Sequence, residues 1–147
     1  MVRYLWAMLF TPEQVAQAER FRPNTLVDHL DIRFGVDASG HLTASMPVDH
    51  RTHQPQGLLH GGATAALAET LGSVGSAILV LSGGKNTVGI ELNVNHLKGV
   101  QSGRVTATGQ LLHQGRTTHV WDIRVRNERQ ELVAVCRLTN MIIDPRP

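Results

Sequence analysis

The sequence predicts an α+β fold in which a curved antiparallel sheet wraps around one long central helix. One segment of about twenty residues is apolar on every side, which is typical of a buried helix. Most other segments alternate apolar and polar residues with a period of two, and short turns join the last four of them. A sheet that curves around the helix satisfies both patterns with one hydrophobic core.

The composition excludes several classes of protein. The 147 residues are 41% hydrophobic and 18% charged, which is enough for one core and unlike a disordered chain. The 14 Lys and Arg against 12 Asp and Glu leave a net charge of only +2, so we expect no nucleic-acid partner. Cys136 is the only cysteine, which excludes an intrachain disulfide and a cysteine-rich zinc module. We therefore expect a single domain over residues 1–147 in the cytoplasm.

The chain is expected to begin with a helical extension at about residues 1–22. Thr11 fits the N-cap of a helix over Pro12–Arg20, and Gln14 would complete a capping box. The apolar run before it is short and lacks a small-residue cleavage site, so it does not indicate a secretory signal. A second short helix is expected near Thr25–Leu30.

Six segments are expected to form strands, because their apolar residues recur at every second position. The sequence Asp37-Ala38-Ser39-Gly40 predicts a hairpin turn between the first two. Edge strands and a polar outer face favour association of two copies. The six expected strands are Ile32–Val36, His41–Val48, Val88–His96, Arg104–Leu112, Thr117–Arg126 and Glu131–Ile143.

The central helix is expected from Ala63 to about Leu81, and its apolar residues cover every face. Its length alone would also admit a membrane span. We expect a buried helix and no membrane partner, because no anchoring residues and no second span accompany it.

Glu69 is the only ionisable residue among the 24 that separate His60 from Lys85. A carboxylate in such a helix is costly to bury unless it is paired or hydrogen-bonded. We interpret Glu69 as a desolvated carboxylate kept for catalysis, either as nucleophile or as general base. The alternative is that it reaches solvent through a gap in the sheet, or pairs with a distant arginine.

His60, Gly61 and Gly62 stand where the helix begins. Free backbone N–H groups and the positive end of the helix dipole would suit an oxyanion hole there. A glycine-rich helix entry without a ligand is the alternative. Glu69 follows Gly61 by about 12 Å along the helix axis, which is too far for both to act on one carbonyl carbon. The site is therefore predicted to lie at the interface of a two-fold dimer, with Glu69 and Gly61 from different copies.

Three further side chains are candidates for this site, and other kinds of site are excluded. Gln54 and His60 could hold water or the carbonyl oxygen, and Ser73 lies four residues beyond Glu69 on the same helix face. The chain carries no serine-hydrolase elbow, P-loop or dinucleotide fingerprint. No metal is expected, because the spacing of the histidines fits no helix or strand face shared by three ligands. They are His41, His50, His53 and His60.

Three runs of sequence recur together in a known family. They are QPQGLLHGG at 54–62, AETLGS at 68–73 and ELNVNH at 91–96. In this order and spacing they resemble the hotdog-fold acyl-CoA thioesterases of the 4-hydroxybenzoyl-CoA/PaaI type. The similarity runs from about Leu30 to Ile142. It is greatest to the group of the 1,4-dihydroxy-2-naphthoyl-CoA and enterobactin proofreading thioesterases.

The resemblance implies a hotdog fold and a homotetramer built from dimers, each with two active sites across its interface. It implies that Glu69 is the nucleophile or the base, that the Gly61 amide polarises the thioester carbonyl, and that Ser73 supports the acyl pocket. Gln54 and His60 would position substrate and water. Coenzyme A would be part of the substrate and no separate cofactor would be needed. The residues implied to contact coenzyme A are Gly89, Asn95, His96, Lys98, His113, Gly115, Arg116 and Thr117.

The sequence therefore predicts a thioesterase that acts on an aromatic or medium-chain acyl-CoA. Two alternatives use the same fold. A hydratase or dehydratase would carry an Asp and a His five residues apart before a helix, and no such pair is present. A non-catalytic acyl-CoA-binding protein would tolerate the loss of Glu69, whereas this chain retains it.

Overall fold

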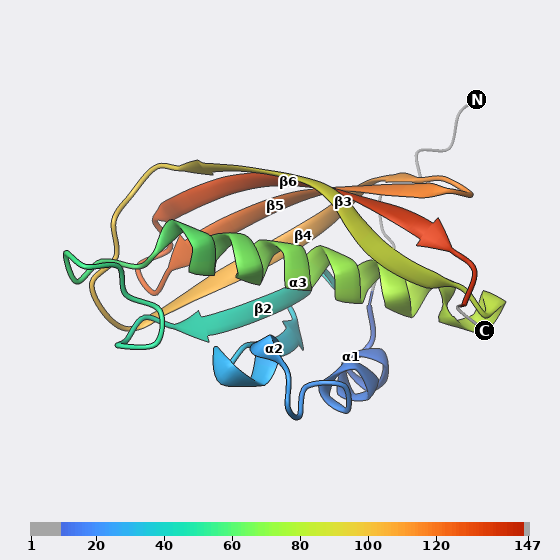
Figure 1. Cartoon of the computed structure of the whole chain (residues 1–147), viewed down its shortest axis with the longest axis horizontal. Helices are drawn as coiled ribbons and strands as arrows, with labels where there is room; N and C mark the ends of the chain where they lie inside the picture. Colours follow the sequence, from blue (N-terminus) through green and yellow to red (C-terminus); the bar gives the residue numbers. More distant parts are fainter. Residues whose placement is uncertain (1–9, 146–147) are drawn as a thin grey trace.

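The computed structural model describes residues 10–145 and has one curved antiparallel sheet with a long helix on its concave face (Figure 1). The strand order in the sheet is β1-β2-β4-β5-β6-β3, and every neighbouring pair is antiparallel. The predicted α+β hotdog architecture is confirmed. The elements are α1 (Pro12–Glu19), α2 (Leu26–His29), β1 (Arg33–Val36), β2 (Leu42–Pro47), α3 (Gly61–Val80), the 3-10 turn η1 (Leu81–Gly83), β3 (Asn86–His96), β4 (Arg104–Gln114), β5 (Thr118–Asn127) and β6 (Leu132–Ile143).

Small residues allow α3 to lie close to the sheet. A Cβ atom on Gly72 would come within 2.5 Å of the Leu138 side chain, and one on Gly75 within 2.7 Å of the Trp121 ring. Trp121 and Leu138 are fully buried beneath the helix. The helix is long and apolar enough to cross a membrane by length and composition, a test that core helices also pass. Its packing against the sheet accounts for the same apolar composition.

The expectation that α3 is buried along most of its circumference is wrong for a single chain. The sheet covers one side of the helix, where seven residues from Thr64 to Ser76 are buried. On the other side Gly62, Glu69 and Ala77 are exposed. The strand next to this open side is β3, an edge strand on which Val88 is 42% and Ile90 51% exposed. Within residues 10–145, the exposed side of α3 therefore lies next to an exposed edge strand, and α3 contacts β3 directly.

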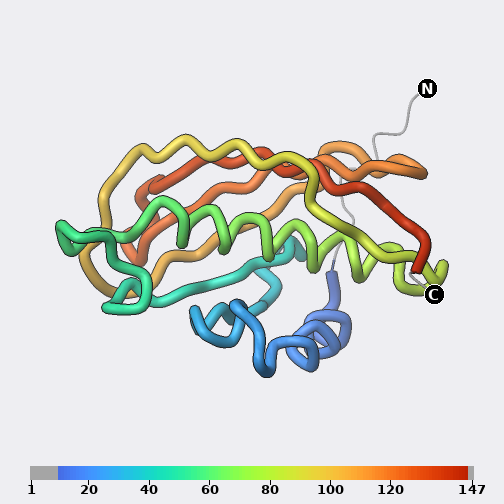
Figure 2. The backbone as a smooth tube through the Cα atoms, viewed as in Figure 1, coloured from blue at the N-terminus to red at the C-terminus, as the bar shows by residue number. Residues whose placement is uncertain are grey.

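The described part of the N-terminal extension, from residue 10 onward, packs on the opposite edge of the sheet, against β1 (Figure 2). The predicted capping box at Thr11 is present, whereas the first nine residues of the expected extension lie outside the described part of the chain. Buried Arg22 pairs with Glu19 at 3.1 Å and with Asp28 at 3.3 Å. Glu19 in turn accepts a hydrogen bond from the backbone of Phe34 in β1. In the part of the chain that the structure describes, the extension therefore covers one edge of the sheet and β3 forms the open edge.

A buried polar network joins α3 to the sheet. The Ser76 hydroxyl lies 2.9 Å from the Trp121 indole nitrogen, 3.0 Å from Nδ1 of His119 and 2.9 Å from the Asn140 amide nitrogen. Asn140 also donates to the backbone carbonyl of Gly72 at 3.0 Å. Because buried polar groups need partners, these bonds fix the height and rotation of the helix over β5 and β6.

We expect the free energy of unfolding to decrease as the pH falls below about 6.5. Burial, with a smaller repulsion from His113, lowers the pKa of His119 from its ordinary value of 6.5. The unfolded chain therefore takes up a proton on His119 at a higher pH than the folded chain. The contribution of His119 to the free energy of unfolding is fully present above about pH 6.5. It is lost, by at most about 1.4 kcal/mol per pH unit, as the pH falls toward the pKa of His119 in the folded chain. Urea unfolding between about pH 7.5 and about pH 5.5 measures this slope. His119→Asn should flatten it, and an unchanged slope would contradict the assignment.

Candidate active site

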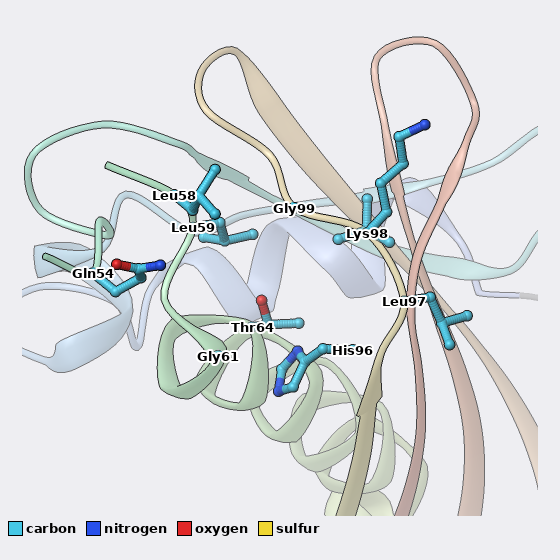
Figure 3. A pocket seen from close by; sticks show the side chains of 10 residues that line it. Gln54, Leu58, Leu59, Gly61, Thr64, His96, Leu97, Lys98 and Gly99 are labelled. Carbon is cyan, nitrogen blue, oxygen red and sulfur yellow. The ribbon is translucent and has the colours of Figure 1, made fainter. Parts of the chain in front are cut away.

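A pocket of about 360 Å³ lies where the N-terminus of α3 meets the end of β3 (Figure 3). Its volume is within the range of small-molecule sites. Apolar side chains make up much of the wall, and a few polar groups are directed into it. The lining residues are Gln54, Leu58, Leu59, Gly61, Thr64, His96, Leu97, Lys98, Gly99 and Val133. Four of the predicted site residues, Gln54, Gly61, His96 and Lys98, therefore lie together.

The first turn of α3 presents a free amide to this pocket. His60 is the N-cap, and its Nδ1 accepts a hydrogen bond from the Gly62 amide at 2.8 Å. The Gly61 amide has no acceptor among residues 10–145. A Cβ atom on Gly61 would lie 2.8 Å from Nε2 of His96, so only glycine lets this ring pack against the helix start. Within residues 10–145 the Gly61 amide is therefore an unused donor at the pocket, and its role as an oxyanion hole stays a prediction.

Gln54 lies on the other side of the pocket, in the loop before α3. Its backbone amide donates to the Leu58 carbonyl at 2.8 Å, and its side-chain oxygen accepts from the Gln56 backbone. The side-chain nitrogen is directed toward the pocket in Figure 3. The loop thus holds Gln54 as a hydrogen-bond donor to the pocket that Gly61 also lines.

Lys98 is the cation at the rim of the pocket, and it is already paired. Its ammonium group donates to Oε1 of Glu131 at 2.6 Å, and Asn127 donates to the other oxygen of Glu131 at 2.7 Å. These two bonds lower the pKa of Glu131, so this carboxylate stays ionised. An anionic ligand at Lys98 would therefore compete with Glu131 or share the lysine with it.

Glu69 is exposed in the single chain and does not line the pocket. Desolvation of Glu69 by a second copy stays a prediction. Within the single chain, the alternative that Glu69 reaches solvent describes its position. The reason is that the sheet covers only the opposite side of α3. The carboxylate lies at the uncovered surface instead, against Gly89 of the edge strand β3.

Ser73 lies one turn beyond Glu69, but its hydroxyl is directed elsewhere. It donates to Oδ1 of Asn140 at 3.4 Å, and Asn140 is fully buried. The shared helix face would allow a hydrogen bond from Ser73 to Glu69, but within residues 10–145 the Ser73 hydroxyl bonds to the buried Asn140 amide instead. Asn140 was not foreseen as part of this region, since it lies 67 residues from Ser73 in the chain.

The residues expected to contact coenzyme A fall into separate groups within one chain. His96 pairs with Ala134 of β6, whereas Thr118 at the β4–β5 hairpin pairs with Met141. Ala134 and Met141 are seven positions apart along β6, or about 23 Å. One chain therefore does not bring all the expected contacts together. Those near the pocket are Asn95, His96 and Lys98, and those in the hairpin are His113, Gly115, Arg116 and Thr117. Gly89 lies at the level where the hairpin begins, because its partner Asn140 is next to Met141.

Within residues 10–145 no group of three or more His, Cys, Asp or Glu side chains lies close enough to hold a metal ion.

The sequence reasoning missed much of the pocket wall. Thr64 could have been found by helical spacing from Gly61, since residues three apart share a helix face. Val133 carries no local signal, because it reaches the pocket only through the pairing of distant strands.

Comparison with known proteins gives a consistent result. Residues 56–134 match the thioesterase superfamily. The proofreading thioesterase EntH of Klebsiella pneumoniae is 48% identical over 120 residues, which are 82% of this chain and 87% of that protein.

Solved structures agree with this similarity. The crystal structure of thioesterase HI1161 from Haemophilus influenzae has a TM-score of 0.83 and 42% identity and covers 95% of each chain. The Escherichia coli PaaI protein from the phenylacetic acid degradation operon has a TM-score of 0.76 and 26% identity, with 89% of this chain and 92% of that chain covered. The resemblance stated from the three sequence runs is confirmed.

Proposed function

The chain belongs to the thioesterase superfamily, and we propose that it hydrolyses an aromatic or medium-chain acyl-CoA to the free acid and coenzyme A. The observation that carries this proposal is the Gly61 amide, which lines the pocket and lacks an acceptor among residues 10–145. An amide at a helix N-terminus stabilises the negative charge that develops on a carbonyl oxygen under attack. The substrate carbonyl is therefore placed against Gly61.

We propose that Glu69 supplies the attack on this carbonyl. As a general base it removes a proton from water while the water oxygen bonds to the carbonyl carbon. As a nucleophile it bonds to that carbon itself, and water then hydrolyses the anhydride. In both routes the carbon–sulfur bond breaks and the thiolate of coenzyme A takes up a proton. Neither route needs a metal or an organic cofactor.

The proposal requires two copies of the chain, because Glu69 and Gly61 are about 12 Å apart on one helix. Glu69 lies beside Gly89 of β3, and Gly61 lies beside His96 of the same strand. A two-fold axis midway between them, near Leu92, would pair β3 with its copy in the antiparallel sense. That axis would bring Glu69 of each chain to Gly61 of the other.

The same two-fold relation supports the division of the expected coenzyme A contacts. It exchanges the two ends of β3, so the hairpin at Arg116 of one copy approaches the pocket of the other. The uncovered surface of α3 and the exposed Val88 and Ile90 would be buried between the copies. We propose the dimer as the minimal active unit and a pair of dimers as the assembled enzyme.

The pocket supports an uncharged, largely apolar substrate portion next to the reacting carbonyl. Leu58, Leu59, Leu97 and Val133 provide the apolar wall. Lys98 at the rim is placed to meet a phosphate of the coenzyme A moiety, since an ammonium group acts there as a point charge. Thiol release from a panel of aryl, short-chain and medium-chain acyl-CoA esters tests the substrate class, and no release from any of them would overturn the proposed function.

Lys98→Met is expected to raise KM for an acyl-CoA about fivefold and to leave kcat unchanged, as loss of one solvent-exposed ion pair predicts. The matched variant is Glu131→Gln, which removes the competing carboxylate from Lys98 and should lower KM. The comparison substrate is the N-acetylcysteamine thioester of the same acid, which carries no nucleotide. If both variants change its KM as much as that of the acyl-CoA, Lys98 does not contact the phosphates.

A further inference from the structure

We propose that Gly89 is a positioning residue for Glu69, because its missing side chain leaves the space in which the carboxylate lies. This inference rests on the proposed function of Glu69 in thioester hydrolysis. It adds a role for a residue of the edge strand that lies outside the pocket and that family resemblance associates only with coenzyme A.

The contact between the two residues is close. A Cβ atom built on Gly89 would lie 2.5 Å from Oε1 of Glu69 and 3.4 Å from its carboxyl carbon. A carbon atom and an oxygen atom that are not bonded do not approach to 2.5 Å, so the carboxylate would have to move. Because Glu69 is a flexible side chain on an exposed helix face, it can move without disturbing the core. Any larger residue at position 89 therefore changes where Glu69 points.

Backbone conformation does not explain this glycine. The positive φ values of the described glycines fall at Gly40, Gly57, Gly84 and Gly103, and Gly89 is not among them. An alanine could adopt the backbone conformation at position 89 without strain. The register of β3 against β6 shifts just after Gly89, between Gly89 and Glu91. Such a shift can occur with other residues, so the space beside Glu69 remains the feature that requires glycine.

Strand β6, which pairs with β3 at Gly89, also holds the helix that carries Glu69. Gly89 pairs in register with Asn140 of β6, and a Cβ atom on Gly89 would lie 3.6 Å from Oδ1 of Asn140. Asn140 binds the Gly72 carbonyl and accepts from Ser73, which are the residues one turn beyond Glu69. The helix is thus fixed over this point of the sheet. The Glu69 carboxylate cannot keep its place by a shift of the helix when position 89 is filled.

Gly89→Ala is the test, with kcat and KM measured on an acyl-CoA and on the N-acetylcysteamine thioester of the same acid. We expect kcat to fall about tenfold for both substrates, because misplacing a reacting group by about 1 Å is costly, while KM for the acyl-CoA changes less than about twofold. Gly83→Ala is the matched control, since nothing lies within 4 Å of a Cβ atom there and the residue has no positive φ. It should leave kcat unchanged.

The double variant Gly89→Ala with Glu69→Gln separates this role from a structural one. If Gly89 acts through Glu69, the alanine adds no further loss once the carboxylate is gone. An equal loss in both backgrounds would overturn the proposal, and so would a rise in KM confined to the acyl-CoA, which would identify Gly89 as a coenzyme A contact. If Glu69→Gln alone retains full activity, the proposed function of Glu69 fails instead.

A crystal structure of Gly89→Ala tests the same proposal without any substrate. We expect the Glu69 carboxylate to lie about 1 Å or more from its present position while β3 and α3 superpose on those of the unmodified protein. A carboxylate that keeps its position in this variant would overturn the proposal.

Discussion

Glu69→Gln is expected to lower kcat for acyl-CoA hydrolysis about 10³-fold and to leave KM and the fold nearly unchanged. The amide is similar in size and shape to the carboxylate, but it can neither accept a proton from water nor attack the carbonyl. The side chain is exposed in the single chain and carries none of the core, so its replacement does not affect folding. Thiol release under saturating substrate measures kcat, and urea unfolding measures stability.

Glu13→Gln is the matched control for this variant. Glu13 is an exposed glutamate on α1, which packs at the opposite edge of the sheet. Its replacement removes the same charge at a distance from the proposed dimer surface and should leave kcat within about twofold, since a solvent-exposed charge contributes little. Full activity of Glu69→Gln, or an equal loss in both variants, would contradict a direct role of Glu69 in the reaction.

The variant does not distinguish a nucleophile from a general base, but isotope transfer does. In a single turnover in ¹⁸O-labelled water, a general base places the label in the released acid. A nucleophile first forms an anhydride, and attack of water on its glutamyl carbon places the label in Glu69. Mass spectrometry of the peptide that contains Glu69 detects whether the ¹⁸O label is present in it.

Much of the fold could be predicted because local pattern and global architecture agree. Residues such as Trp121, Ile123 and Val125 alternate with polar neighbours and face the core of the sheet. The small residues of α3 match its close approach to the strands. The pattern was least informative in β3, where Val88 and Ile90 alternate as if packed yet remain exposed. A period of two identifies a buried face but does not say whether the same chain or a second copy covers it.

The candidate site was only partly predictable for a similar reason. Gly61 and His60 belong to a helix start, and the physics of helix ends points to them from the sequence alone. The exposure of Glu69 in the single chain could not be predicted, because counting apolar neighbours along a helix does not reveal which side the sheet leaves open. Asn140 and Glu131 act near the site through side-chain contacts with residues far away in the chain, and such contacts carry no signal in local sequence.

Co-expression of Glu69→Gln with Gln54→Ala is expected to restore activity that neither variant has alone. In the proposed dimer each site takes Glu69 from one copy and Gln54 from the other. A mixed dimer therefore contains one site with both changes and one site with neither. If the two chains assemble at random, half of the dimers are mixed, and about a quarter of all sites are intact. Differently tagged chains, co-expressed and purified through both tags, allow the mixed dimer to be assayed on its own.

Gln54→Ala alone should lose about 10²-fold in kcat, as removal of one donor to the reacting oxygen does, so the recovery is easily measured. Co-expression of a Gln54→Ala chain with a His60→Ala chain is the matched control, and we expect it to restore no activity. Both residues come from the loop that leads into the first turn of α3 in the same chain, so every mixed dimer keeps a defect in each site. Recovery in the first pair and none in the second requires that the catalytic carboxylate and the carbonyl-binding wall belong to different chains. No recovery in either pair would place Glu69 and Gln54 in the same chain's site. That result is incompatible with the separation along α3, unless the substrate is attacked by a group other than Glu69.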